Sequence, residues 1–391
     1  MPRWVFGAQV LWLGLIIAGC ASQPLLEDGS ETPPLALVPV GEAGIIDQRG
    51  RFREIFCALN DDHGAELPDH RPCVQALHDL PGETPGDGRP VNLGRARIDL
   101  HLVIVPGLAA ECFGEWAVPL RDAARHVEQL GYEVSWIDVD GLSSSRRNAG
   151  EISEAILGME DVSRPIVLLG YSKGMSDALE ALVDPEAAER ITAAVSYAGA
   201  VNGSPLAEKS SAALLKALAY VPGLSCDSGD RGAVDSLLRS NRTEWLAAHR
   251  LPASIHYYSV VSYAAREQIS ALLHSSYDEL AMIDPRNDSQ LLYYDAIVPG
   301  SRLLGYVNAD HFAIALPLAR DSTLTAEFVN RNAFPREILL EAILKSIEED
   351  LLAAGSPPIP SPKAAVPAAA NARSAGSSFA ATACRSAVAP C

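Results

Sequence analysis

A regular alternation of short apolar segments and amphipathic segments runs through residues 97–350. The apolar segments are continuously hydrophobic and rich in β-branched residues, which is typical of strands buried on both faces. The predicted strands cover residues 98–105, 133–139, 165–169, 191–197, 255–261 and 303–307, and the clearest predicted helices cover 115–130, 149–159 and 173–183. Strands that alternate with helices form a mostly parallel sheet covered by helices. The sequence therefore predicts an α/β fold.

The alternation is interrupted at residues 202–250, where the pattern is helical and amphipathic and indicates no strand. An insertion of helices between two strands is suited to covering a site at the edge of the sheet, so we expect a helical cap there. The alternative is a helical excursion that packs elsewhere.

The charge balance limits the classes of partner. Lys and Arg number 31 and Asp and Glu 49, which gives a formal net charge of −18 at pH 7. Such a chain repels phosphate backbones, so we expect no nucleic-acid partner. The same charge opposes electrostatic docking on anionic lipid.

The N-terminus predicts export. Arg3 precedes an uncharged apolar stretch, residues 4–18, which has the length of a signal-peptide core. Small residues and then Cys20 follow, an arrangement that resembles the lipobox of bacterial lipoproteins. The resemblance implies a signal peptide at residues 1–19, acylation of Cys20, a membrane anchor and, since no Asp follows the Cys, location in the outer membrane of the bacterial cell envelope. An ordinary cleaved signal with a chance Cys is the alternative.

The remaining segments flank the predicted α/β domain at residues 96–352. Residues 20–50 are predicted to be a flexible tether, residues 51–95 a small Cys-containing arm, and the Ala/Ser/Pro-rich residues 353–391 a disordered tail. Each is poor in the periodic apolar pattern that marks the central domain.

Export makes disulfides permissible. Cys57 with Cys73 is the favoured pair because the two flank a polar loop, and Cys112 with Cys226 is a weaker one. His63 and His70 inside that loop raise the alternative of a zinc site. The spacing C-x5-H-x6-H-x2-C matches no common zinc pattern, so we expect neither a metal nor a cofactor.

The sharpest motif is Gly170-Tyr171-Ser172-Lys173-Gly174, which fits G-x-S-x-G. A buried strand precedes it and a helix follows it, as a nucleophile elbow requires. The tight turn would lift the Ser172 hydroxyl clear of the sheet and aim the Lys173 N–H at a developing oxyanion. A Gly-flanked Ser in a plain loop is the alternative.

A serine nucleophile needs a base, and the base needs a carboxylate that orients it. Among nine histidines, His311 follows the last predicted strand and can reach the carboxyl edge of the sheet. Asp295 is the preferred acid because it lies at a turn between Ser172 and His311. The other aspartates considered are Asp288, Asp284 and Asp310.

A second oxyanion donor should follow the first predicted strand. In Val105-Pro106-Gly107-Leu108 the glycine permits close approach of the backbone, and the Leu108 N–H can point at the oxyanion. Leu108 and Lys173 are therefore the predicted oxyanion hole.

With these motifs in place, the chain resembles the α/β-hydrolase superfamily over roughly residues 97–350, and its lipase and esterase members most of all. The resemblance implies an α/β-hydrolase fold and cleavage of small-molecule or lipid carboxylic esters through an acyl-enzyme, without a cofactor. An acyltransferase or thioesterase could use the same triad. A catalytically silent envelope lipoprotein on the same scaffold is the alternative from another class.

Overall fold

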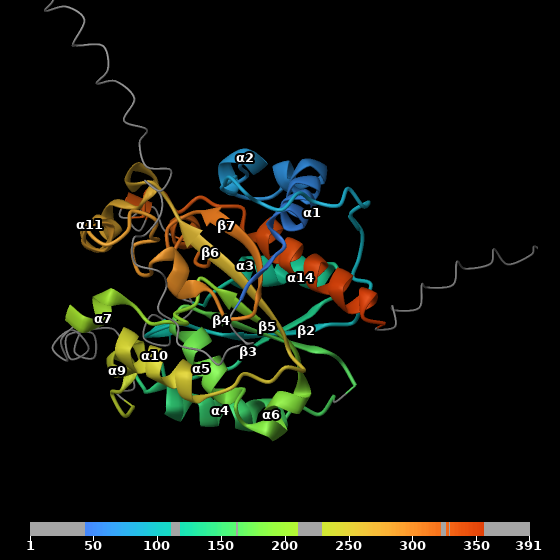
Figure 1. The fold of residues 1–391 in the computed structure, drawn as a ribbon. Helices are drawn as coiled ribbons and strands as arrows, with labels where there is room; N and C mark the ends of the chain where they lie inside the picture. Colours follow the sequence, from blue (N-terminus) through green and yellow to red (C-terminus); the bar gives the residue numbers. More distant parts are fainter. Residues whose placement is uncertain are drawn as a thin grey trace, which may run out of the picture. The chain divides into compact units, whose positions relative to one another are not determined.

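The computed structural model describes residues 44–110, 118–161, 163–209, 229–321, 326–327 and 329–355. Within these residues one sheet of seven parallel strands runs in the order β1-β7-β6-β5-β4-β2-β3 (Figure 1). The strands are β1 (Ile46–Asp47), β2 (His101–Val105), β3 (Glu133–Trp136), β4 (Ile166–Tyr171), β5 (Ile191–Tyr197), β6 (His256–Tyr263) and β7 (Arg302–Asn308). The predicted parallel α/β architecture is confirmed. All six predicted strands are present: β5 has the predicted bounds, and the other five differ at one or both ends.

Twelve α-helices and four short 3₁₀ turns are defined in this part of the chain. The helices are α1 (Arg49–Asp62), α2 (Cys73–Ala76), α3 (Arg121–Gln129), α4 (Ser145–Leu157), α5 (Lys173–Ala181), α6 (Pro185–Arg190), α7 (Pro205–Lys209), α9 (Ala233–Leu237), α10 (Arg239–Ala248), α11 (His274–Ala281), α12 (Leu318–Asp321) and α14 (Arg336–Ala353). The 3₁₀ turns are η1 (Gly64–Glu66), η3 (Arg266–Gln268), η4 (Ala271–Leu273) and η5 (Tyr293–Ala296).

Each face of the sheet is covered by its own set of helices. Alternate strand residues such as Leu102 and Ile104 share a core with apolar residues of α1, α3 and α14. Their neighbours Val103 and Val105 belong to a second core with residues of α4, α5 and α6. Figure 1 shows the two helical groups on opposite sides of the sheet. Because both faces of the sheet are buried, side chains on both faces of a strand must be apolar, which accounts for the continuous apolar sequences of these strands.

The N-terminal arm is built into the domain. The Ile46 N–H donates to the Ser301 carbonyl at 2.9 Å, so β1 extends the sheet at the edge next to β7. Helix α1 then packs against α14, with Phe52 and Phe56 fully buried. The tether predicted for residues 20–50 therefore ends before Ile46, and the arm predicted for 51–95 begins with a regular helix. The sequence could not predict β1, because a segment of two residues is too short to show the hydrophobic periodicity of a strand.

The disulfide between Cys57 and Cys73 is present and ties α1 to α2, with the two Cα atoms 5.3 Å apart. The predicted pairing is confirmed. The other candidate pair, Cys112 with Cys226, lies outside the described residues, as does Cys20.

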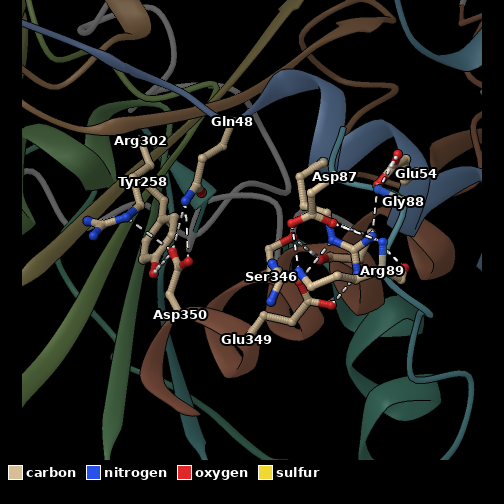
Figure 2. Close-up of polar contacts among 12 residues, drawn as sticks. Gln48, Glu54, Asp87, Gly88, Arg89, Tyr258, Arg302, Ser346, Glu349 and Asp350 are labelled. Carbon is tan, nitrogen blue, oxygen red and sulfur yellow. Dashed lines mark hydrogen bonds and ion pairs between the residues drawn. The ribbon is translucent and has the colours of Figure 1, made fainter. Parts of the chain in front are cut away.

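Polar contacts fix the arm to the C-terminal helix (Figure 2). The Asp350 carboxylate accepts hydrogen bonds from the Gln48 amide at 3.2 Å and the Tyr258 hydroxyl at 2.8 Å, and it pairs with Arg302 at 3.1 Å. The preceding residue, Glu349, pairs with Arg51 at 2.6 Å. Gln48, Arg51, Glu349 and Asp350 also line a cavity of about 190 Å³ between the arm and α14.

Between residues 202 and 250 the described segments contain α7, α9 and α10 and no strand. The absence of a strand in these segments agrees with the helical pattern, and a cap over the site remains a prediction because residues 210–228 lie outside the description. The tail predicted at 353–391 is likewise outside it beyond residue 355. Among the described helices, none has both the length and the apolar character needed to cross a bilayer.

Candidate active site

Ser172 sits at a sharp turn between β4 and α5, with φ 55° and ψ −128°. A non-glycine residue at positive φ is strained, and such strain collects at functional sites. A Cβ at Gly170 would lie 2.4 Å from the Met175 Cα, and one at Gly174 would lie 2.3 Å from the Pro106 carbonyl oxygen. Both glycines are therefore required for the turn to pack this closely.

His311 lies beyond β7 and reaches the nucleophile candidate. Its Nε2 is 2.9 Å from the Ser172 Oγ, and the residue is only 3% exposed. The Tyr171 hydroxyl donates to the His311 carbonyl at 2.8 Å, and the two rings stack with centroids 5.1 Å apart. Tyr171, the residue before Ser172, thus holds the imidazole against the serine.

The carboxylate that orients His311 belongs to Asp288. His311 Nδ1 lies 2.7 Å from Asp288 Oδ2, and the His311 N–H donates to the Asp288 carbonyl at 2.9 Å. The Ser262 hydroxyl donates to the same Oδ2 at 2.8 Å. The Oδ1 accepts the N–H groups of Gln290 at 2.9 Å and Leu291 at 2.8 Å. Four donors therefore satisfy both oxygens of this buried carboxylate and fix its orientation.

The prediction of Asp295 as the acid is wrong, because its side chain pairs elsewhere. Asp295 Oδ1 lies 3.1 Å from an Arg239 nitrogen, and its Oδ2 has no hydrogen-bond partner among the described residues. Burial raises the pKa of Asp295 to about 7, against the opposing effect of Arg239. Of the other two aspartates considered, Asp284 pairs with Arg286 at 2.7 Å and Asp310 accepts the Ser270 hydroxyl at 2.7 Å.

A signal for Asp288 was present in the sequence. It lies in the polar run Asp284–Gln290, whose Asn and Asp residues favour turns. The structure forms a turn there, with Ser289 at φ 81°. The turn points the carboxylate back toward the strand ends, a direction that spacing alone cannot give.

The two predicted oxyanion donors flank the nucleophile. A Cβ at Gly107 would lie 2.8 Å from the Ser172 Cβ, so the loop that carries Leu108 packs directly against the elbow. Lys173 is the first residue of α5, where backbone N–H groups lack partners within the helix. The helix N-terminus also favours negative charge at this point.

The Lys173 side chain points away from this chemistry. Its Nζ donates to both carboxylate oxygens of Asp177, at 2.8 and 2.7 Å, and both residues are 1% exposed. The Asn148 amide adds a hydrogen bond to Asp177 at 2.8 Å. The ammonium therefore lies in the interface of α4 and α5, and only the backbone of Lys173 is available to a substrate.

The described arrangement is a serine hydroxyl, an imidazole that can take its proton, a carboxylate that fixes the imidazole, and two candidate amide donors. Such a set can perform nucleophilic attack on an acyl carbonyl. The described residues at this site offer no cluster suited to a metal ion.

Comparison with solved structures places the chain among related proteins. The metagenomic carboxyl esterase MGS0156 aligns with a TM-score of 0.76 and 46% identity, over 82% of this chain and 97% of its own. The mature lipase BlEst2 of Bacillus licheniformis aligns with a TM-score of 0.47 and 18% identity, over 67% and 96% of the two chains. The lipase of Staphylococcus hyicus aligns with a TM-score of 0.49 and 11% identity, over 69% and 100%.

No family model and no curated protein matches the sequence. The assignment depends on the first of the three structures, since the other two are too dissimilar to carry it. At 46% identity over most of both lengths, and with the same parallel sheet, this chain belongs to the α/β-hydrolase superfamily together with that carboxyl esterase.

Proposed function

We propose that the protein is a serine hydrolase that cleaves carboxylic esters through an acyl-enzyme, with Ser172, His311 and Asp288 as its triad. The observation that carries the proposal is the continuous hydrogen-bonded path from Ser172 Oγ to His311 Nε2, 2.9 Å, and from His311 Nδ1 to Asp288 Oδ2, 2.7 Å. The similarity to a carboxyl esterase supports ester hydrolysis as the chemistry.

In the proposed mechanism His311 takes the Ser172 proton as the hydroxyl oxygen attacks the ester carbonyl. Asp288 stabilises the imidazolium and keeps its Nδ1 protonated. The Leu108 and Lys173 amides bind the oxyanion of the tetrahedral intermediate, and each such donor contributes about 3–4 kcal/mol to the transition state. His311 then protonates the leaving alcohol, and water attacks the acyl-enzyme by the reverse path.

Active-site labelling tests the chemistry. We expect a fluorophosphonate probe to label the wild-type protein and to leave Ser172→Ala unlabelled. Soluble esters of short to medium acyl chains should be hydrolysed by the wild type only. Labelling of Ser172→Ala at the wild-type rate would reject Ser172 as the nucleophile. Faster turnover of an emulsified long-chain triglyceride than of soluble esters would reject the substrate class.

We also propose that Cys20 is lipid-modified and anchors the enzyme in the bacterial envelope, at the outer membrane. The support is the apolar stretch of residues 4–18 and the small residues before Cys20. Expression with a radiolabelled fatty acid tests this: label on the wild type and none on Cys20→Ser is expected. Sucrose-gradient separation of the inner and outer membranes then identifies the membrane that holds the protein. Recovery of the labelled protein with the inner membrane would reject the proposed location at the outer membrane.

A further inference from the structure

We propose that His63, His126 and Glu341 form a zinc-binding site that joins the N-terminal arm to α3 and α14. The three come from distant parts of the chain: His63 follows α1, His126 lies on α3 and Glu341 on α14. Their candidate ligand atoms all lie within 4.8 Å of one another. None of them contacts the triad in the described hydrogen-bond network, so this site is separate from the ester chemistry.

The two imidazoles converge on one carboxylate oxygen. His126 Nε2 is 2.7 Å and His63 Nε2 is 2.9 Å from Glu341 Oε2, and the two rings have centroids 5.6 Å apart. Ligands around a tetrahedral zinc ion at ~2.0–2.2 Å lie about 3.3 Å apart. The side chains therefore need to separate by about half an ångström to admit the ion, which rotation of the Glu341 carboxylate can supply.

The His63 imidazole lies between two carboxylates. Its Nε2 faces Glu341, and its Nδ1 faces Asp62 Oδ2 at 3.1 Å. A neutral imidazole carries one N–H, so it cannot donate to two carboxylates at once, and either a second proton or a metal ion at Nε2 satisfies both contacts. With Nδ1–H donated to Asp62, the Nε2 lone pair is free to bind a metal, which is the usual outer contact of a metal-bound histidine.

Glu341 is a buried carboxylate whose described ionic partners are His63 and His126, which carry a charge only when protonated. The residue is fully buried, and its Oε1 has no hydrogen-bond partner among the described residues. Lys345, one turn further along α14, could have neutralised it, but its Nζ donates to the Gly94 carbonyl at 2.5 Å. An uncompensated buried carboxylate is costly, and a divalent cation removes that cost.

The donor set favours zinc. Two imidazole nitrogens and one carboxylate oxygen leave a fourth position for water, and such a set suits Zn²⁺ better than Mg²⁺ or Ca²⁺. The side chains of His63 and His126 are 21% and 13% exposed, so an ion can enter from solvent. Cys57 and Cys73, the thiols nearest His63 in the sequence, are joined to each other and cannot serve as ligands.

The test is zinc binding by the untagged, oxidised protein after treatment with EDTA. We expect one Zn²⁺ per chain after gel filtration, a higher melting temperature with ZnCl₂, and the visible absorbance of four-coordinate Co²⁺ when CoCl₂ replaces it. His126→Ala and Glu341→Gln should each weaken Zn²⁺ affinity roughly 100-fold or more, and Asp62→Asn about 10–100-fold. His256→Ala, a half-buried histidine on β6, is the matched control and should bind like the wild type.

Ester hydrolysis should persist in every variant, which reports folding independently of the metal. If Glu341→Gln fails to fold, His63→Gln and His126→Gln replace it. Substoichiometric Zn²⁺ on the wild type, or unchanged affinity in the folded ligand variants, would overturn the proposal. The proposal would also be overturned if Zn²⁺ did not change the melting temperature and the melting temperature fell as pH rose from 6 to 8. That result would mean that the cluster holds a proton in place of a metal.

Discussion

Replacing Asp288 by Asn separates the two candidate acids, because the neighbouring groups determine how the amide is oriented. The Oδ1 position accepts two backbone N–H groups, from Gln290 and Leu291, so the Asn oxygen must remain there. The NH₂ group then faces His311 Nδ1, where the carboxylate accepted a hydrogen bond at 2.7 Å. Since the amide donates, Nδ1 must lose its proton, and Nε2 carries it instead.

An imidazole protonated at Nε2 cannot take the Ser172 proton. We therefore expect kcat to fall about 10⁴-fold in Asp288→Asn, which at ~1.36 kcal/mol per decade is about 5 kcal/mol of transition-state stabilisation. The assay is steady-state hydrolysis of p-nitrophenyl butyrate, with thermal unfolding to verify the fold. Asp295→Asn is the matched control and should retain most of the activity, because Asp295 contacts Arg239 and not His311. Equal losses in both variants would refute the assignment.

Three further predictions concern stability and the elbow. Burial raises the pKa of Asp295 to about 7, so its contribution to the free energy of unfolding is complete below about pH 4 and is lost as pH rises through 7. In urea unfolding between pH 5 and 8, Asp295→Asn should therefore show a weaker decrease of the unfolding free energy with pH than the wild type. An equal decrease in both proteins would contradict the prediction. The bridge between Cys57 and Cys73 spans 16 residues, so its removal by a double Ser variant should lower the unfolding free energy by about 3 kcal/mol, and equal urea midpoints would argue otherwise. Gly174→Ala places a Cβ 2.3 Å from the Pro106 carbonyl oxygen and should reduce kcat at least ~100-fold, whereas near-wild-type turnover would show that the turn can relax.

The local parts of the site could be predicted from sequence. The strand, the glycines and the helix of the elbow are contiguous in the chain and constrain one another. The sequence pattern was therefore enough to predict Ser172 and its turn. His311 was accessible because it directly follows a strand, and the ends of parallel strands meet at one edge.

The aspartate that orients His311 could not be predicted from the sequence in the same way. Asp288 and Asp295 lie in one irregular segment between β6 and β7, and both are buried. Which of them faces His311 depends on the turn at Ser289 and on the Arg239 side chain of α10, a contact across 56 residues. Long-range pairing of this kind leaves no periodic trace. The same reason hides β1, whose two residues become a strand only beside β7.

The pairing of β1 with β7 bears on how the enzyme should be produced. The strand that leads to His311 has its outer edge covered by Ile46 and Asp47, through donors at Ile46 and Gln48. A recombinant product truncated at Arg51 would bare that edge and offer unpaired backbone groups to other molecules. Expression boundaries that begin upstream of Gly44 keep this edge closed and guard against self-association at the strand on which the histidine depends.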